Sequence, residues 1–185
     1  MLRLVPAILA LVSASASAPV MAQDRIDDTP SGQPVPRFVT LKFDVANGRS
    51  GPSQAHPIAW RYTRSGLPMQ VIAETEEWRR VVDPEGETTW MHRSILSGRR
   101  SAFTIDETIL RARAEADAPI EAIAEAGIVL SLERCRTGWC RVEAQGYRGW
   151  VETATLWGLY EDEREDAPNG SGALSASLTR DTALR

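Results

Sequence analysis

The middle of the chain consists of short apolar runs separated by residues that favour turns. In residues 66–71, Leu67, Met69 and Val71 alternate with Pro68 and Gln70. Alternation of this kind places successive side chains on opposite faces of a strand and buries one of them. Further short runs rich in β-branched and aromatic residues follow at similar spacing. The pattern predicts an all-β fold built from short strands.

The turns between these runs have recognisable chemistry. Asp83-Pro84-Glu85-Gly86 has Pro at the second and Gly at the fourth position of a hairpin turn. Turn residues also fill 47–52, and an irregular stretch is expected from there to residue 65. The predicted strands of this unit are 38–43, 66–71, 78–82, 88–91, 95–96 and a final edge strand at 102–103.

The whole series recurs towards the C-terminal end with an offset of 60 or 61 residues. The offset holds across strands and turns alike, so we interpret it as a duplicated fold unit. Residues 112–126 are rich in Ala and Glu, which by propensity favours a helical turn there. The duplication favours an irregular loop instead, as expected for the equivalent 51–65. The matched residues are Gly66 and Gly127, Trp78 and Trp139, Val81 and Val142, Trp90 and Trp150, Leu96 and Leu156, and Gly98 and Gly158.

The N-terminal segment is typical of a secretory signal peptide. An early Arg3 precedes an apolar run from Leu4 to Val12, and small residues lead to a cleavage site between Ala22 and Gln23. The run is shorter than the roughly 20 residues that span a bilayer. The alternative is an uncleaved N-terminal anchor. We expect a periplasmic or secreted protein without membrane insertion after signal cleavage.

The remaining chain divides by composition. Expected are a signal peptide at 1–22, a flexible leader at 23–36, one domain at 37–103, a second at 104–158, and a disordered acidic, low-complexity tail at 159–185. The chain has 21 basic and 25 acidic residues, a formal net charge of −4. That balance favours neither nucleic acid nor an anionic membrane surface as a partner.

The chain has two cysteines, Cys135 and Cys140, separated by a short segment that carries a glycine. In an oxidising compartment such a pair tends to form a disulfide, here across a hairpin. The alternative is two buried free thiols. No His or carboxylate cluster lies beside them in the sequence, so we predict no metal site and no cofactor.

These motifs together resemble the bacterial SH3-like (SH3b) domain family. The first unit has Asn47, Arg49, Gly51 and Pro52 of a loop motif, followed by Trp78, Val81 and Trp90; the second has Arg113, Trp139, Val142, Gly149, Trp150 and Val151. Gly48 departs from the family, which has an apolar residue there. Matching Arg113 to Arg49 requires a loop about three residues shorter in the second unit, without the loop glycine and proline.

The resemblance implies two tandem small SH3-like β-barrels, similar to those in a group of exported proteobacterial proteins. It further implies a role in binding cell-wall peptide or in tethering envelope proteins. Because the stretch between the units is short, we expect rigid docking, with Phe103 and Trp157 at the interface.

Six residues are candidates for ligand binding: Arg49, Trp60, Tyr62, Trp78, Arg113 and Trp139. Trp60 and Tyr62 have no aromatic counterpart in the second unit, and an aromatic groove beside Arg49 would hold an extended peptide and pair with its carboxylate. For Trp78 and Trp139 the alternative is core packing. For the two arginines the alternative is hydrogen bonding to loop carbonyls.

Catalysis is not indicated. A Cys/His peptidase of the cell-wall class needs a His after its nucleophilic Cys, whereas His56 and His92 precede both cysteines. No G-x-S-x-G motif is present. We therefore predict a non-enzymatic module that binds peptidoglycan stem peptide or another extended peptide. The alternative is a structural adaptor that holds another envelope protein.

Overall fold

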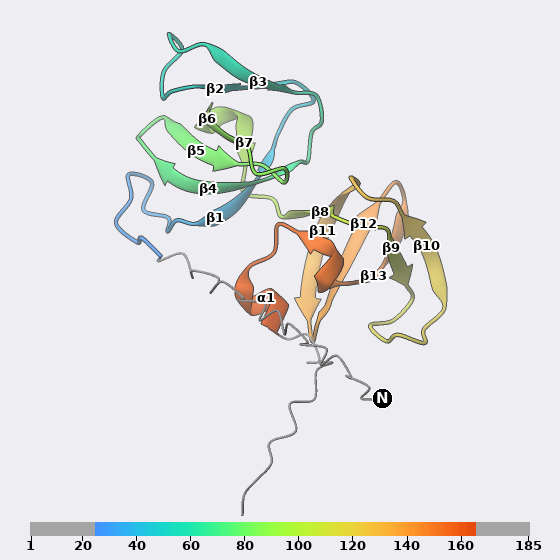
Figure 1. Ribbon diagram of the computed structural model, residues 1–185. Helices are drawn as coiled ribbons and strands as arrows, with labels where there is room; N and C mark the ends of the chain where they lie inside the picture. Colours follow the sequence, from blue (N-terminus) through green and yellow to red (C-terminus); the bar gives the residue numbers. More distant parts are fainter. Residues whose placement is uncertain (1–24, 166–185) are drawn as a thin grey trace, which may run out of the picture.

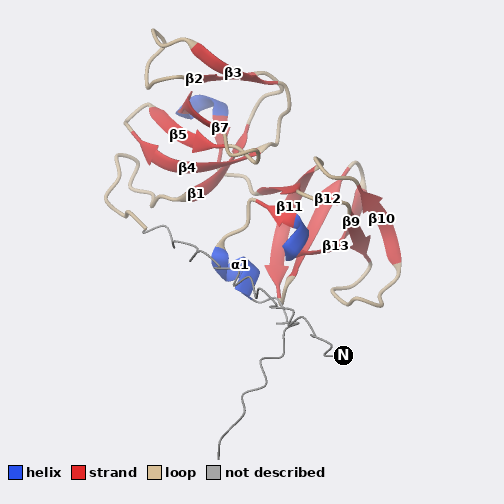
Figure 2. Ribbon diagram, in the orientation of Figure 1, coloured by secondary structure: helices blue, strands red, loops and turns tan. Residues whose placement is uncertain are grey.

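The computed structural model describes residues 25–165, and two seven-stranded antiparallel sheets account for about half of them (Figure 1). Helical structure is confined to short segments (Figure 2). The prediction of an all-β fold is confirmed. The predicted signal peptide at 1–22 lies outside the described residues, as does most of the predicted tail. Within residues 25–165, the structure holds no helix of the length and apolarity that a membrane crossing requires.

Barrel 1 is the sheet formed by β1 to β7, in the order β3-β2-β6-β5-β4-β1-β7. Strands β4, β5 and β6 follow one another through tight turns, and β1 joins them from the other side. Its elements are β1 (Arg37–Leu41), β2 (Ala46–Arg49), β3 (Ile58–Tyr62), β4 (Pro68–Glu74), β5 (Trp78–Val82), β6 (Thr88–His92), the 3₁₀ turn η1 (Arg93–Ile95) and β7 (Leu96–Ser97).

Barrel 2 is the sheet formed by β8 to β14, in the order β10-β9-β13-β12-β11-β8-β14. Strand for strand this repeats the order of barrel 1, which is the duplication expected from the sequence. Its elements are β8 (Ser101–Thr104), β9 (Thr108–Arg111), β10 (Ile120–Ala124), β11 (Val129–Arg136), β12 (Trp139–Ala144), β13 (Tyr147–Glu152), η2 (Thr153–Thr155) and β14 (Leu156–Trp157), and the helix α1 (Glu161–Glu165) follows it.

The structure differs from the sequence-based expectations at four segments. Residues 47–49 and 58–62 form strands β2 and β3 instead of turn and irregular chain, and 120–124 form strand β10 instead of a helical turn or loop. Residues 102–103 lie in β8, which pairs with β11 and β14 and thus opens barrel 2. In the three segments not expected to be strands, backbone pairing with a neighbouring strand outweighs local composition.

The segments flanking the barrels are packed against them where they are described. Val35, in the predicted leader, is buried in the core of barrel 1, and Ile26 pairs with it in an isolated bridge. Leu159, in the predicted tail, is buried in the core of barrel 2 and precedes α1. Each segment contributes an apolar side chain to a core. This contact explains why the segment packs on its barrel although its composition is mostly polar.

Each barrel has its own apolar core at equivalent positions. Met69, Val81 and Met91 of barrel 1 are fully buried, as are their counterparts Leu130, Val142 and Val151 of barrel 2. Complete burial of such side chains contributes roughly 1.5–3 kcal/mol each. These are the alternating positions predicted from the sequence.

The barrels are docked against each other. Phe38 of β1 packs edge-to-face on Trp157 of β14, with ring centroids 5.2 Å apart. The backbone N–H of Phe38 also donates to the Tyr160 hydroxyl (3.1 Å). Phe103 and Val129 of barrel 2 pack against the core of barrel 1. The expectation that Phe103 and Trp157 lie at the interface is therefore confirmed.

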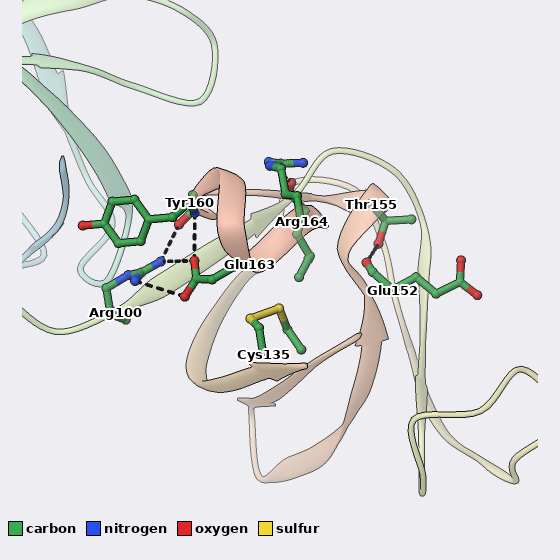
Figure 3. The surroundings of a disulfide bond; sticks show 10 residues. Arg100, Cys135, Glu152, Thr155, Tyr160, Glu163 and Arg164 are labelled. Atoms are coloured by element: carbon green, nitrogen blue, oxygen red, sulfur yellow. Dashed lines mark hydrogen bonds and ion pairs between the residues drawn. A yellow bond between two sulfur atoms is a disulfide. The ribbon is translucent and has the colours of Figure 1, made fainter. Parts of the chain in front are cut away.

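The two cysteines form a disulfide at the tip of the β11–β12 hairpin (Figure 3). Cys135 and Cys140 are opposite each other in the strand register, with Cα atoms 4.0 Å apart. Thr137 and Gly138 make the turn with positive φ angles of 47° and 76°. This left-handed conformation is accessible to glycine without steric cost. The disulfide expected from the sequence is confirmed.

Candidate functional site

One arginine in each barrel holds the long loop that connects the second and third strands of that barrel. Arg49 lies opposite Trp90 and donates from Nη1 to the carbonyl of His56 (2.7 Å). In barrel 2, Arg111 lies opposite Trp150 and donates from Nη1 to the carbonyl of Ala118 (2.9 Å). The structural counterpart of Arg49 is therefore Arg111, and the two loops have equal length.

Arg113, which the sequence alignment matched to Arg49, lies instead in the loop of barrel 2. It forms an exposed ion pair with Glu115 (3.1 Å). The alignment was wrong because barrel 2 lacks the loop glycine that would have fixed it. Barrel 1 needs a glycine at residue 51, since a Cβ there would come within 2.3 Å of the His56 ring. Barrel 2 has no histidine at that position and therefore no need for the glycine. A usable signal was present, since a proline stands eight residues after Arg49 and again after Arg111.

The two aromatic residues of β3 are not brought together as a groove beside Arg49. Tyr62 packs on the core of barrel 1, and its hydroxyl donates to Asp83 Oδ2 (3.0 Å). Burial raises the pKa of the Tyr62 hydroxyl well above its usual range. Trp60 lies opposite Gly48 and is 49% exposed. Of the pair, Trp60 is the side chain that offers free surface.

Trp78 and Trp139 begin equivalent strands and are both largely buried. In barrel 1 the His92 ring packs edge-on against Trp78, with centroids 5.4 Å apart. His92 is held there by Glu77 (Nε2 to Oε2, 3.0 Å), and this bond lowers the pKa of the Glu77 carboxyl. In barrel 2 the residue opposite Trp139 is Glu152, so no imidazole packs on the indole.

A small cleft of about 160 Å³ opens beside Trp139, and we call it the Trp139 cleft. Its floor includes Thr108 and Thr155, whose hydroxyls share a hydrogen bond of 2.8 Å. Two exposed carboxylates flank it, and Arg111 supplies the positive charge. The complete lining is Glu107, Thr108, Ile109, Arg111, Trp139, Glu152 and Thr155. Of the candidate residues from the sequence, Trp139 is in this cleft, and the charged members that sequence reasoning missed are Arg111, Glu107 and Glu152.

The size and charges of the Trp139 cleft limit what it can hold. Its volume is below the roughly 300 Å³ at which drug-sized ligand pockets begin, so it suits one residue of a longer ligand. The two carboxylates favour an ammonium group. Arg111 keeps further guanidinium N–H groups besides the one bonded to Ala118. A ligand with both an ammonium group and a carbonyl or carboxylate oxygen matches this set.

A second, apolar hollow of about 500 Å³ lies on barrel 2, and we call it the apolar groove. Its apolar lining is Leu110, Ala122, Ile123, Ala124, Ile128, Ala144 and the exposed Tyr147, and the polar side chains of Glu121, Glu125 and Gln145 complete it. In barrel 1, Tyr62 stands at the position of Ala124 and Asp83 at that of Ala144, and their hydrogen bond crosses the same region. The groove thus follows from two large-to-small differences between the repeats.

Neither metal binding nor thiol chemistry is supported in the part of the chain that the structure describes. Residues 25–165 contain no group of three or more His, Cys, Asp or Glu side chains placed to hold a metal ion. Both cysteines are consumed in the disulfide. The groups that line the Trp139 cleft offer charge, hydrogen bonds and aromatic contact for recognition.

Comparison with known proteins gives a clear match at the level of the domain. A family model described as the bacterial SH3 domain matches the chain twice, at residues 42–98 and 105–158. No curated protein matches the chain. Among solved structures, NlpC2 and NlpC1 from Trichomonas vaginalis are each 12% identical to it with a TM-score of 0.31. Each match covers 66% of this chain. It covers 48% of NlpC2 and 45% of NlpC1, so this chain spans less than half the length of either protein.

Proposed function

The chain belongs to the bacterial SH3 domain family, and from that premise we propose that it is an exported, non-catalytic module that binds cell-wall stem peptide. Domains of this family generally bind cell-wall or peptide ligands. The specific ligand is our inference from the chemistry of barrel 2. The matched residues cover both barrels, and we assign the peptide to the second.

The observation that carries the proposal is the Trp139 cleft. A stem peptide presents free ammonium and carboxylate groups a few bonds apart. Glu107 and Glu152 suit the ammonium group, and Arg111 suits the carboxylate or a peptide carbonyl. The Trp139 indole is largely buried, and where it lines the cleft it offers apolar contact to the atoms beside the charged groups. Barrel 1 has His92 packed on the equivalent indole, so we assign it a supporting role.

The absence of catalysis is part of the proposal. Nucleophilic hydrolysis of a peptide needs an activated nucleophile beside a base. The cysteines are bonded to each other, and His92 is engaged by Glu77 and Ser94. The Trp139 cleft contains threonine hydroxyls but no histidine. Binding without turnover is the function that this set of groups supports.

Export is proposed from the N-terminal sequence, with the mature chain beginning at Gln23. The disulfide is consistent with an oxidising compartment. N-terminal sequencing of the protein recovered from the periplasm or medium tests this directly. A chain that begins at Gln23 supports export with cleavage, whereas an intact N-terminus in the cytoplasm contradicts it.

Co-sedimentation with purified sacculi tests the binding function. We expect the wild-type protein to pellet and the Glu107→Gln/Glu152→Gln variant to remain largely in solution. These two side chains are exposed, so their replacement leaves the fold intact. The matched control is Glu85→Gln, an exposed carboxylate in a turn of barrel 1, which should pellet like the wild type. Equal pelleting of all three proteins would refute the assignment to this cleft.

A second candidate function, a structural adaptor, is favoured by one specific observation. Ile123 and Tyr147 beside the apolar groove are 58% and 57% exposed. Exposed apolar side chains of this size mark interaction surfaces for proteins. If neither the wild type nor any variant pellets with sacculi, crosslinking from Tyr147 in envelope extracts tests the adaptor function.

A further inference from the structure

The junction of the two barrels encloses a cleft that neither barrel has alone. Its volume is about 530 Å³, and we call it the junction cleft. Lys42 and Ser97 line it from barrel 1, Ser131 lines it from barrel 2, and Arg99 and Arg100 line it from the linker between β7 and β8. None of these residues belongs to the Trp139 cleft.

The walls of the junction cleft are held in place by contacts across the junction. The Thr40 hydroxyl donates to the carbonyl of Arg99 and shares a hydrogen bond of 3.0 Å with Ser101. Arg64 of barrel 1 donates to the carbonyl of Gly127 in barrel 2. Gly66 and Val129 approach so closely that a Cβ at residue 66 would lie 3.3 Å from Val129 Cγ1. The cleft is thus preformed and does not depend on a ligand to bring its sides together.

The junction cleft has an excess of positive charge. Three basic side chains and no carboxylate line it. Arg100 is neutralised, because it pairs with Glu163 (2.8 Å), donates to the carbonyl of Gly158 and stacks on Tyr160 (Figure 3). Lys42 and Arg99 are exposed and have no ion-pair partner within residues 25–165.

Hydroxyl groups add neutral donors to these two cations. Ser97 Oγ accepts from the Arg99 backbone N–H (3.2 Å), which leaves the Ser97 hydroxyl proton free to donate. The Ser131 side chain makes no hydrogen bond to any described residue. Besides Glu163, which is paired with Arg100, Asp44 is bonded at the rim, where it accepts from Ser65 (2.6 Å). Two unpaired cations and free hydroxyl donors form a set that is complementary to an oxyanion.

We propose that the junction cleft binds a small organic oxyanion, a carboxylate or a phosphate ester, whose charged group pairs with Lys42 and Arg99. The volume lies within the range of small-molecule sites, and it leaves room for the organic part of the ligand beyond its charged group. Because both barrels line the site, the tandem arrangement creates a function that a single SH3-like unit lacks. The proposal is independent of peptide binding at the Trp139 cleft.

Calorimetric titration with three sugars tests the proposal. Glucuronate carries a carboxylate, glucose 6-phosphate carries a phosphate, and glucose is their neutral match. We expect at least one of the two anions to bind and glucose not to bind. Arg99→Gln and Lys42→Gln should each weaken binding about tenfold, the usual cost of losing a charged hydrogen bond. Arg61→Gln, an exposed arginine on β3 outside the cleft, should leave the affinity unchanged.

The two anions distinguish the sources of the oxyanion, since a preference of tenfold or more identifies carboxylate or phosphate as the natural group. Three results would overturn the proposal: no binding of either anion, equal binding of glucose, or binding that survives both Arg99→Gln and Lys42→Gln. Nuclear magnetic resonance shifts at the Ser131 and Gly66 amides provide a second readout, and shifts confined to Trp139 would place the anion in the other cleft.

Discussion

The two barrels close the same hairpin position by different chemistry. In barrel 1, Glu74 of β4 lies opposite Arg79 of β5, and their side chains form a buried ion pair (3.0 Å) that Arg37 joins at 2.6 Å. In barrel 2, Cys135 and Cys140 occupy the equivalent positions and form the disulfide. One repeat therefore joins β4 to β5 by charge, and the other joins the equivalent β11 to β12 by a covalent bond.

This difference explains how the flanking segments are used. The carboxylate of Glu74 also accepts from the Ser31 backbone N–H (2.8 Å), so the ion pair anchors the segment before β1 to barrel 1. The disulfide of barrel 2 is uncharged and needs no hydrogen-bond partner, so it does not anchor a flanking segment in this way. We conclude that barrel 1 is sensitive to loss of charge at Glu74, whereas barrel 2 is sensitive to reduction.

Removing the charge from Glu74 should have the largest effect. Glu74→Gln leaves Arg37 and Arg79 buried without a carboxylate, which should lower the free energy of unfolding of barrel 1 by about 3 kcal/mol. Amide hydrogen exchange in β4 and β5 measures this, with β11 and β12 as the internal reference. Glu76→Gln, an exposed neighbour, is the matched control. Unchanged exchange in β4 would show that the ion pair does not hold barrel 1.

Removing the disulfide should have the next largest effect, and in the other barrel. Cys135→Ala/Cys140→Ala releases a short loop and should destabilise barrel 2 by about 2 kcal/mol in the chain-entropy account. Chemical denaturation followed by exchange in β11 and β12 checks the value. Reduction of the wild type with dithiothreitol should reproduce the effect. If the protection of barrel 1 fell by as much as that of barrel 2, the two closures would not be independent.

A third test concerns a pair of facing positions at which one repeat has its glycine on one strand and the other repeat has it on the partner strand. In barrel 1, Gly48 lies against Thr89, and a Cβ at residue 48 would come within 2.5 Å of Thr89 Oγ1. In barrel 2 the small residue is on the other side of the pair, with Leu110 against Gly149. Gly48→Ala should therefore cost about 1 kcal/mol or more through overpacking. Thr89→Gly in the same chain should recover part of the loss in thermal unfolding; no recovery would contradict reciprocal packing.

This pair also shows which departures from the family pattern a sequence can explain. Gly48 stood out as a glycine where an apolar residue is expected, and the structure places Leu110 at that position in barrel 2. The compensation lies on β6 and β13, and only the strand register connects the two. A single-sequence comparison identifies the anomaly but not the partner that accommodates it.

The smallest effect is expected from mild acid, which removes only part of the Glu74 charge. Burial acts to raise the pKa of Glu74, but hydrogen bonds from Ser31 and Arg37 lower it from 4.5 to about 2. A lowered pKa in the folded state stabilises the protein above the unfolded value, and this contribution is lost as pH falls from about 4.5 towards 2. Barrel 1 should thus lose protection in this range before barrel 2, whose disulfide does not titrate. Simultaneous loss would show that other groups dominate.

The sequence was sufficient for the strands that have a buried face. Alternation identified β4, β5, β11 and β12, because Met69, Val71 and their equivalents point into the cores. Strands β3 and β10 were missed for a physical reason: most of their side chains are exposed, so their stability comes from backbone pairing with β2 and β9 and leaves no alternating pattern.

The candidate site was predicted less completely than the fold. Trp139 was identified from the repeat, but Arg111 was passed over for Arg113 because the loop of barrel 2 lacks the glycine that fixes the alignment. The carboxylates Glu107 and Glu152 carry no motif, and they meet Trp139 only through the pairing of β12 with β13 and β13 with β9. Strand pairing of this kind cannot be predicted from the local sequence pattern.

The most direct test of the central claim, that barrel 2 binds the peptide at the Trp139 cleft, is a nuclear magnetic resonance titration with a synthetic stem peptide. The indole N–H signals of Trp78 and Trp139 report on equivalent places in the two barrels. We predict that the Trp139 signal shifts with saturation while the Trp78 signal stays in place. A shift at Trp78 or Trp60 with Trp139 unaffected, or no shift at any of the three, would contradict the account.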